Sequence, residues 1–294
     1  ITVSWCVNIK SMISRWTSWF LIWEWHTQNA TVGTGHAGTR GWTGYSWNRK
    51  LIKDPAKLIQ DLKDDHVYVV LNEHPHDGLR PHDDAYPMFI RDLGADTLKN
   101  GVPLFDAGNP EYMKAFMKHA HQESDQMGVA FWWLDWQQDY LYPYVRGTSM
   151  RHLPWLNKIY YDYSARNNLR GAGFSRWAGW GDHRHPIQFS GDAVANWELL
   201  RFEIDLTTTS SNAGCFFWAH DLGGFYGGDD AELYTRWTQF GLLNSSLRIH
   251  SVYDEKLDRR PWLWGDKEEE AMKRIYHLRS QFDALYLFFC PSVL

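Results

Sequence analysis

Short apolar segments recur along the chain without polar alternation. VYVVLNEH (67–74) and VAFWWLDW (129–136) are the clearest, because β-branched and aromatic residues run almost unbroken to the first polar residue. A strand buried on both faces has this pattern, which is typical of parallel sheets. Further segments of this kind are AGFSRWAG (172–179), PIQFSGD (186–192), AGCFFWAHD (213–221) and SLRIHSV (246–252). These segments predict buried parallel strands.

Helical periodicity separates the predicted strands. Met113, Phe116, Met117 and Ala120 recur at the i, i+3, i+4 and i+7 spacing, and similar spacing marks 233–240 and 271–282. Such spacing places apolar side chains on one face of a helix. The alternation of strand and helix predicts an α/β fold with a parallel sheet. No glycine-rich phosphate loop follows a strand, which argues against a dinucleotide-binding fold.

Polar side chains stand at the ends of nearly all the predicted strands. They are Glu24 and His26, Asn72 and His74, Asp135, Arg176, Asp192, His220 and Asp221, and Arg248 and His250. In a (β/α)8 barrel all strand ends meet on one face, and that face carries the active site. We therefore predict a (β/α)8 TIM barrel. No linker, repeat or low-complexity segment indicates a second domain.

Two aspartates each close an apolar strand. Asp135 ends GVAFWWLD and Asp192 ends HPIQFSGD, where Gly191 lets the chain turn. Each acid can be a cap of the helix that follows it. If both strands belong to one barrel, however, the acids face each other across its mouth. Glycoside hydrolysis needs such a pair, with carboxyl groups roughly 5–5.5 Å apart for retention and about 6.5–9.5 Å apart for inversion.

Other strand ends offer groups that bind hydroxyls. Arg176 and His250 can hold and orient a sugar ring through hydrogen bonds. A structural ion pair is the alternative for these cations, and for Arg248 it is the preferred interpretation. Asp221 follows an apolar run like the other two acids, and we expect it to support Arg176 or the acid/base residue.

The composition narrows the class of ligand. The chain has 294 residues with 18 tryptophans and 16% aromatic residues, which favours a flat ligand such as a sugar, a nucleobase or a quaternary amine, or else an aromatic-rich core. The net charge of −5 gives no reason to expect nucleic acid. No apolar run of 18 residues predicts a membrane span. Three widely spaced cysteines match no zinc or disulfide pattern and leave the compartment open.

Two histidine- and aspartate-rich segments raise the question of a metal. They are HPHDGLRPHDD (74–84) and GDHRHP (181–186). A hydrolytic metal site draws its ligands from such clusters, but neither segment completes a known ligand pattern. We therefore predict no metal, and a metal-dependent hydrolase stays the less favoured alternative.

Five motifs in order resemble those of glycoside hydrolase family 31, the clan of retaining α-glucosidases and α-xylosidases. They are WWLDWQQ, FSRWAGWGDHRHPIQFSGD, the following Trp197, AHDLGGF and LRIHS. The resemblance implies that Asp135 is the nucleophile and Asp192 the general acid/base of a retaining, exo-acting α-glycosidase without a cofactor. It also implies a sugar site lined by Arg176, Asp221 and His250 and walled by Trp133 and Trp197. We include His74 and Glu24 among the substrate-binding residues.

The chain departs from this family pattern at several places. Gln137 and Gln138 follow the nucleophile strand where other residues are usual, and Ile22 replaces an acid that grips the terminal sugar, so that this contact is lost or shifted to Glu24. The sugar is therefore open, with α-galactose and N-acetyl-α-galactosamine among the options. A catalytically impaired carbohydrate-binding barrel is the alternative function.

The ends of the chain are also unusual for the family. Residues 1–19 are too few for a first strand and helix, and the C-terminus stops without the β-sandwich that members normally carry. We expect an atypical N-terminal segment over 1–19 and the catalytic barrel over 20–289. The resemblance then implies a barrel fragment that lacks its first βα unit.

Overall fold

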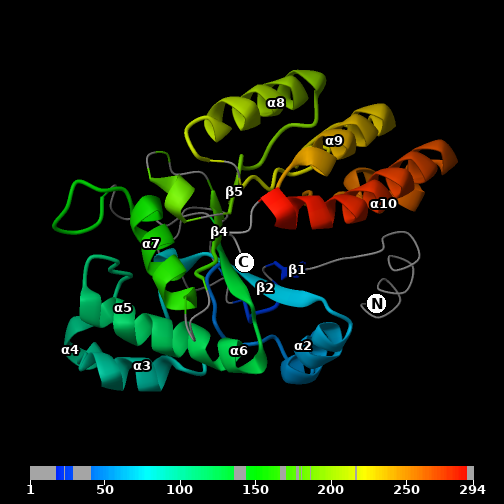
Figure 1. The fold of residues 1–294 in the computed structure, drawn as a ribbon. Helices are drawn as coiled ribbons and strands as arrows, with labels where there is room; N and C mark the ends of the chain where they lie inside the picture. The colour runs from blue at the N-terminus through cyan, green and yellow to red at the C-terminus, as the bar shows by residue number, and fades with distance from the viewer. Residues whose placement is uncertain are drawn as a thin grey trace. The chain divides into compact units, whose positions relative to one another are not determined.

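A computed structural model describes residues 18–22, 24–28, 41–135, 144–165, 170–176, 179, 181–185, 187–215 and 217–289 (Figure 1). The chain divides into two compact units, one formed by Thr17–Gly181 and the other by the part that begins at Asp182. Across the described ranges, no helix is long and apolar enough to span a membrane. Each unit is described by itself below.

A parallel sheet forms the centre of the first unit. Its strands are β1 (Ser18–Leu21), β2 (Tyr68–Glu73), β3 (Phe131–Leu134) and β4 (Phe174–Arg176). Neighbours in the sheet are neighbours in sequence, with Leu21 beside Leu71, Asn72 beside Trp133, and Leu134 beside Ser175. This confirms the parallel strands predicted at 67–74, 129–136 and 172–179. Strands that pair in chain order with helical crossovers are what a βα barrel requires.

Helices cover the strands of this unit. They are α2 (Pro55–Asp64), α3 (Tyr86–Leu93), α4 (Thr97–Asn100), α5 (Pro110–Phe116), α6 (Gln122–Met127) and α7 (His152–Ser164). Asp54 and Asn109 cap α2 and α5 by accepting backbone N–H groups. Between α5 and α6 the backbone widens into a π-turn over Met117–His121. A 3₁₀ turn at Pro75–Asp77 follows β2. Helix α2 packs on β2 and α6, and α7 packs on β3 and β4.

Aromatic rings fill the interior of the first unit. Trp133 packs against Phe20 and Phe174, with ring centroids 5.9 and 5.2 Å away. A second group joins Trp25 to Trp47 at 5.2 Å and to Trp132 at 5.9 Å. Edge-on ring pairs of this kind stabilise a core beyond their buried area. Several of the tryptophans that suggested a flat ligand are therefore core residues.

Three long helices dominate the second unit: α8 (Trp197–Ser211), α9 (Ala231–Leu243) and α10 (Asp266–Phe289). Helix α9 packs against both α8 and α10 (Figure 1). The two-residue strand β5 (Gln188–Phe189) and 3₁₀ turns at Asp182–Arg184, Glu255–Leu257 and Pro261–Leu263 complete the unit. The helical periods at 233–240 and 271–282 are thus confirmed. Leu200, Leu222, Leu233 and Trp237 form one buried cluster.

Two predicted strands of this unit, 213–221 and 246–252, do not form. Trp218 makes one isolated parallel bridge to Gln188, closed by the Ala219 N–H, which donates to the Gln188 carbonyl at 2.9 Å. Strand β5 is too short to pair with a longer segment. The chain turns away at Gly191, whose φ of 95° is not strand geometry. The prediction was right about the extended path of 217–221 and wrong about a regular ladder.

Candidate active site

Asp135 follows β3 directly and is held from both neighbouring strands. The Arg176 side chain, from β4, donates its Nε–H to Asp135 Oδ1 at 2.8 Å. The Asn72 side chain, from β2, donates Nδ2–H to Asp135 Oδ2 at 3.2 Å. The backbone N–H of Asp135 adds a bond to the Glu73 carbonyl at 3.1 Å. The carboxylate is therefore buried, oriented and next to a cation.

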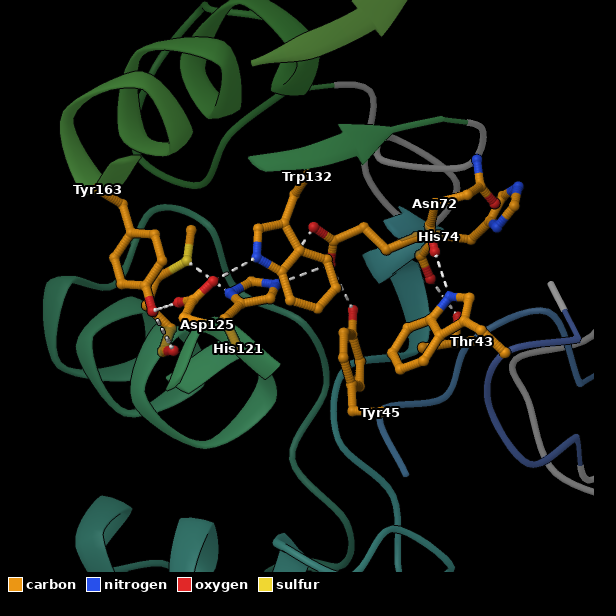
Figure 2. A network of polar contacts seen from close by, with 11 residues as sticks. Thr43, Tyr45, Asn72, His74, His121, Asp125, Trp132 and Tyr163 are labelled. Carbon is orange, nitrogen blue, oxygen red and sulfur yellow. Dashed lines mark hydrogen bonds and ion pairs between the residues drawn. The ribbon is translucent and has the colours of Figure 1, made fainter. Parts of the chain in front are cut away.

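His74 lies on the same side of the site as Asn72 (Figure 2). Its Nε2 is 3.9 Å from Asp135 Oδ2. Burial, aided by His76, His26 and Arg176, lowers the pKa of His74 well below 6.5, so the imidazole is neutral at physiological pH. The contact between His74 and Asp135 is therefore not an ion pair. A neutral imidazole here can hydrogen-bond a ligand without neutralising the carboxylate.

A buried polar cluster, Glu73 with Tyr45, His121 and Tyr160, backs this strand end. The Tyr45 hydroxyl donates to Glu73 Oε2 at 3.1 Å, and His121 Nε2 lies 3.0 Å from the same oxygen. Burial and the nearby Glu73 carboxylate raise the pKa of Tyr160 well above 10. Side chains alternate along a strand, so Glu73 points to Tyr45 and His121 while its neighbour Asn72 points to Asp135. The π-turn brings His121 to Glu73, and such turns often occur near functional sites.

In the second unit, Asp192 stands three residues beyond the end of β5. Gly191 makes the left-handed turn that was expected of it, with φ 95°. The Tyr226 hydroxyl donates to Asp192 Oδ2 at 3.2 Å. Trp197 is 43% exposed, and its indole N–H donates to Asp230 Oδ2 at 3.0 Å. Asp192 is thus a partly accessible acid with exposed aromatic residues in the same unit.

Asp221 and Arg248 form a fully buried ion pair in this unit. The Arg248 guanidinium also lies 4.7 Å from the centre of the Phe189 ring, a cation–π contact. The structural ion pair expected for Arg248 is therefore confirmed. His250 lies nearer the surface, with its ring 5.1 Å from that of Phe225.

A second buried polar chain runs behind β5. Glu203 Oε1 accepts the Ser190 hydroxyl at 2.6 Å and Oε2 accepts the Trp237 N–H at 2.8 Å. His220 Nδ1 lies 3.0 Å from Ser190 Oγ, and its Nε2 lies 2.8 Å from Thr207 Oγ1. Burial raises the pKa of Glu203 to about 7 and lowers that of His220 to about 3. Ser190 and His220 come just before Asp192 and Asp221. These hydrogen bonds therefore fix the backbone that carries both acids.

The cap alternative fails for the helices that follow the two acids in the described part of the chain. The cap of α8 is Asn196, which accepts the Leu199 N–H, and the residue before α7 is Arg151. Asp192 lies four residues before Asn196 and bonds Tyr226 instead. Both acids therefore have contacts suited to a site rather than to helix ends.

The structure places the remaining predicted residues as follows. Asp135, Arg176 and His74 come together in the first unit. Trp133, two residues before Asp135 on β3, is 1% exposed and packs in the core against Phe20 and Phe174. Glu24 is exposed in a turn after β1. Gln137 and Gln138 lie outside the described residues.

Two residues in these contacts were not among the predicted site residues. Asn72 had been noted only as a polar strand end, although that position was itself the available signal. Tyr226 had no signal, because its contact with Asp192 spans 34 residues of sequence.

The histidine-rich loop is explained by local contacts. His76 Nε2 lies 3.2 Å from Asp77 Oδ2, and Asp83 accepts the backbone N–H groups of Tyr45 and Arg80 at 2.8 and 2.9 Å. Within the described ranges, no three His, Cys, Asp or Glu side chains are grouped so as to hold a metal ion.

Comparison with known proteins identifies the family. The model of the glycosyl hydrolases family 31 TIM-barrel domain matches residues 22–286. The chain belongs to glycoside hydrolase family 31. It is 37% identical over 99 residues to a probable glucan 1,3-alpha-glucosidase of Arabidopsis thaliana, which covers 34% of this chain and 11% of that protein. It is 24% identical over 286 residues to neutral alpha-glucosidase C of Macaca fascicularis, covering 84% and 37% of the two chains.

Solved structures of this family share the fold. The cycloalternan-degrading enzyme from Trueperella pyogenes superposes with a TM-score of 0.73 at 15% identity, covering 97% of this chain and 47% of that one. The family 31 chain described here spans less than half the length of each of these relatives. The TIM-barrel fold predicted from the sequence is confirmed by this membership.

Proposed function

We propose that this family 31 chain is the catalytic barrel of a retaining α-glycoside hydrolase that releases a terminal α-linked sugar. The observation that carries the proposal is the setting of Asp135, a buried carboxylate oriented by Arg176 and Asn72 at a strand end. A nucleophile must present one oxygen to the anomeric carbon, and the hydrogen bonds from Arg176 and Asn72 fix the orientation of both Asp135 oxygens. Relatives named alpha-glucosidase support the reaction class.

In the proposed reaction Asp135 attacks the anomeric carbon while Asp192 protonates the glycosidic oxygen. The C–O bond to the leaving group breaks, and a covalent glycosyl ester forms on Asp135. Asp192, now a carboxylate, takes a proton from water, which attacks the same carbon and frees Asp135. Two inversions leave the sugar in its original α configuration. The chemistry needs no cofactor.

The proposal gives the surrounding residues separate tasks. Arg176 and neutral His74 bind hydroxyls next to Asp135, and Trp133 packs in the core behind β3. Trp197 and His250, both partly exposed in the second unit, are the proposed sugar-binding residues there. Asp221 is fully buried on Arg248, so its task is to hold that cation and the strand end. Glu24, exposed after β1, takes the place of the terminal-sugar acid that Ile22 replaces.

A panel of aryl α-glycosides tests this function. Glucosides, xylosides, galactosides and N-acetylgalactosaminides are offered to the wild type, to Asp135→Ala and to Asp162→Ala, a matched control at an exposed acid of α7. We expect one sugar to be cleaved, the α anomer to appear first by NMR, and only Asp135→Ala to lose turnover. Sugar binding without hydrolysis would favour a binding barrel, and loss of turnover in a chelator would favour a metal-dependent hydrolase.

A further inference from the structure

Two loops of the second unit are joined through their backbones. We call 191–197 the acid loop and 223–230 the glycine loop. The N–H groups of Phe225 and Tyr226 both donate to the Ala193 carbonyl, at 2.6 and 3.0 Å, and the Ala195 N–H donates to the Tyr226 carbonyl at 2.8 Å. Val194 and Tyr226 accordingly form a parallel bridge. The backbone of Tyr226 is therefore fixed relative to the loop that carries Asp192.

A glycine makes this close approach possible. A Cβ atom on Gly224 would lie 2.6 Å from the Ala195 Cα, and its φ of +84° is in the left-handed region. Any larger residue would push the two loops apart. Because the backbone of Tyr226 is already held, only the rotamers of its side chain are fixed when its hydroxyl reaches Asp192.

The Tyr226 side chain returns across the joined loops to the acid. Its hydroxyl donates to Asp192 Oδ2 at 3.2 Å, and its ring packs edge-on against Phe225 at 4.7 Å. Tyr226 is 43% exposed, so its side chain reaches the surface. A phenol can donate to this oxygen whether the carboxyl group is protonated or ionised.

We propose that Tyr226 is a positioning residue for the acid/base Asp192, holding Oδ2 so that Oδ1 exchanges the proton with the leaving group and then with water. The proposal rests on the proposed function, in which Asp192 is the acid/base. Tyr226 itself transfers no proton. It fixes the χ1 rotamer of Asp192 in both half-reactions, in which the carboxyl group alternates between its acid and base forms.

Leaving-group dependence is the kinetic test. Tyr226→Phe keeps the ring and removes the hydroxyl, and Tyr253→Phe is the control, since Tyr253 is 101% exposed. Acid catalysis matters most for poor leaving groups. We expect Tyr226→Phe to lower kcat/KM about tenfold for aryl glycosides whose phenol leaving group has a high pKa. For nitrophenyl glycosides, which have good leaving groups, we expect a loss of less than about twofold. An equal loss for both classes would indicate a merely structural role and overturn the proposal.

A second readout does not depend on turnover. Three-bond couplings from the Asp192 Cγ to the backbone nitrogen and carbonyl carbon report the χ1 population in solution. We expect one dominant rotamer in the wild type and in Tyr253→Phe, and averaging in Tyr226→Phe. Unchanged couplings in Tyr226→Phe would overturn the inference even if the protein cleaves no substrate. Failure of Asp192→Ala to show the leaving-group signature would instead refute the role proposed for Asp192.

Discussion

The chemistry of the Asp135 carboxylate depends on the side chains that contact it. Arg176 contacts one oxygen and Asn72 the other, while the neighbouring His74 is neutral because burial lowers its pKa well below 6.5. The pair of Arg176 and Asp135 is largely shielded, with side chains 14% and 10% exposed. Removing one member of a buried pair leaves the other charge uncompensated.

A double-mutant cycle on this pair gives the first prediction. Arg176→Gln should lower the free energy of unfolding by about 3 kcal/mol, because it leaves the Asp135 carboxylate buried next to an amide. The neutral double variant Arg176→Gln with Asp135→Asn should recover about 2 kcal/mol of that loss. Urea unfolding measures both. The exposed pair Arg236 and Glu232 is the control, where Arg236→Gln should cost no more than about 0.5 kcal/mol. Additive effects at Arg176 and Asp135 would contradict this view.

The elements are positioned by two buried polar groups that no periodicity reveals. The cluster of Glu73, Tyr45, His121 and Tyr160 joins β2 to the π-turn, and the chain from Glu203 to His220 joins α8 to the ends of two extended segments. Both lie behind strand ends that carry proposed site residues. Their role at this scale is to keep those ends in place.

The second prediction concerns His121. His121→Leu keeps a side chain of similar bulk but removes a hydrogen-bond donor from the buried Glu73 carboxylate, which we expect to cost about 2 kcal/mol. Combining it with Glu73→Gln should restore part of the stability, since a neutral amide costs less to bury. Chemical unfolding tests this. A double variant less stable than His121→Leu alone would show that Glu73 does not depend on His121.

Glu203 gives a pH-dependent prediction. Burial raises its pKa from the ordinary 4.5 to about 7 in the folded protein, so the folded state holds this proton more tightly than the unfolded state. The free energy of unfolding should therefore fall as pH rises from about 4.5 to 7, by about 3 kcal/mol in total, and stay level above that range.

Glu203→Gln should remove this dependence. The new amide can accept from the Trp237 N–H and donate to Ser190, whose hydroxyl then donates to neutral His220. We expect the variant to match the wild type near pH 4 and to be about 2–3 kcal/mol more stable at pH 8. Glu232→Gln, an exposed change on α9, is the control. Parallel stability curves for the wild type and Glu203→Gln would refute the buried-acid interpretation.

Sequence patterns predicted the elements better than the contacts between them. VYVVLNEH and VAFWWLDW encode their burial locally, so β2 and β3 were predictable. The segment 213–221 has the same apolar letters, but its ladder depends on how long β5 runs, and Gly191 ends β5 early. The contacts of Glu203 and Tyr226 depend on side chains far away in sequence, which composition and spacing do not determine. The positions of Asp135 and Asp192 after β3 and β5 were predictable, because the apolar runs before them mark the strands.

At the scale of the whole molecule, family 31 membership and the parallel βα order agree on a TIM-barrel domain. Each of the two compact units carries one of the proposed catalytic acids, Asp135 in the first and Asp192 in the second. In the first unit the described strands and helices alternate as the βα pattern in the sequence predicted, whereas the strands predicted at 213–221 and 246–252 in the second unit do not form. In the proposed reaction, Asp135 becomes covalently bound to the sugar.

Trapping that intermediate is the most direct test of Asp135 as the nucleophile. The protein is incubated with 5-fluoro-α-glycosyl fluorides of glucose, xylose and galactose, which slow the hydrolysis of a glycosyl ester, and is then digested and analysed by mass spectrometry. We expect one of these sugars to label the peptide containing FWWLD at Asp135, and we expect no label on Asp135→Ala. A label on another carboxylate, or turnover that persists in Asp135→Ala, would contradict it.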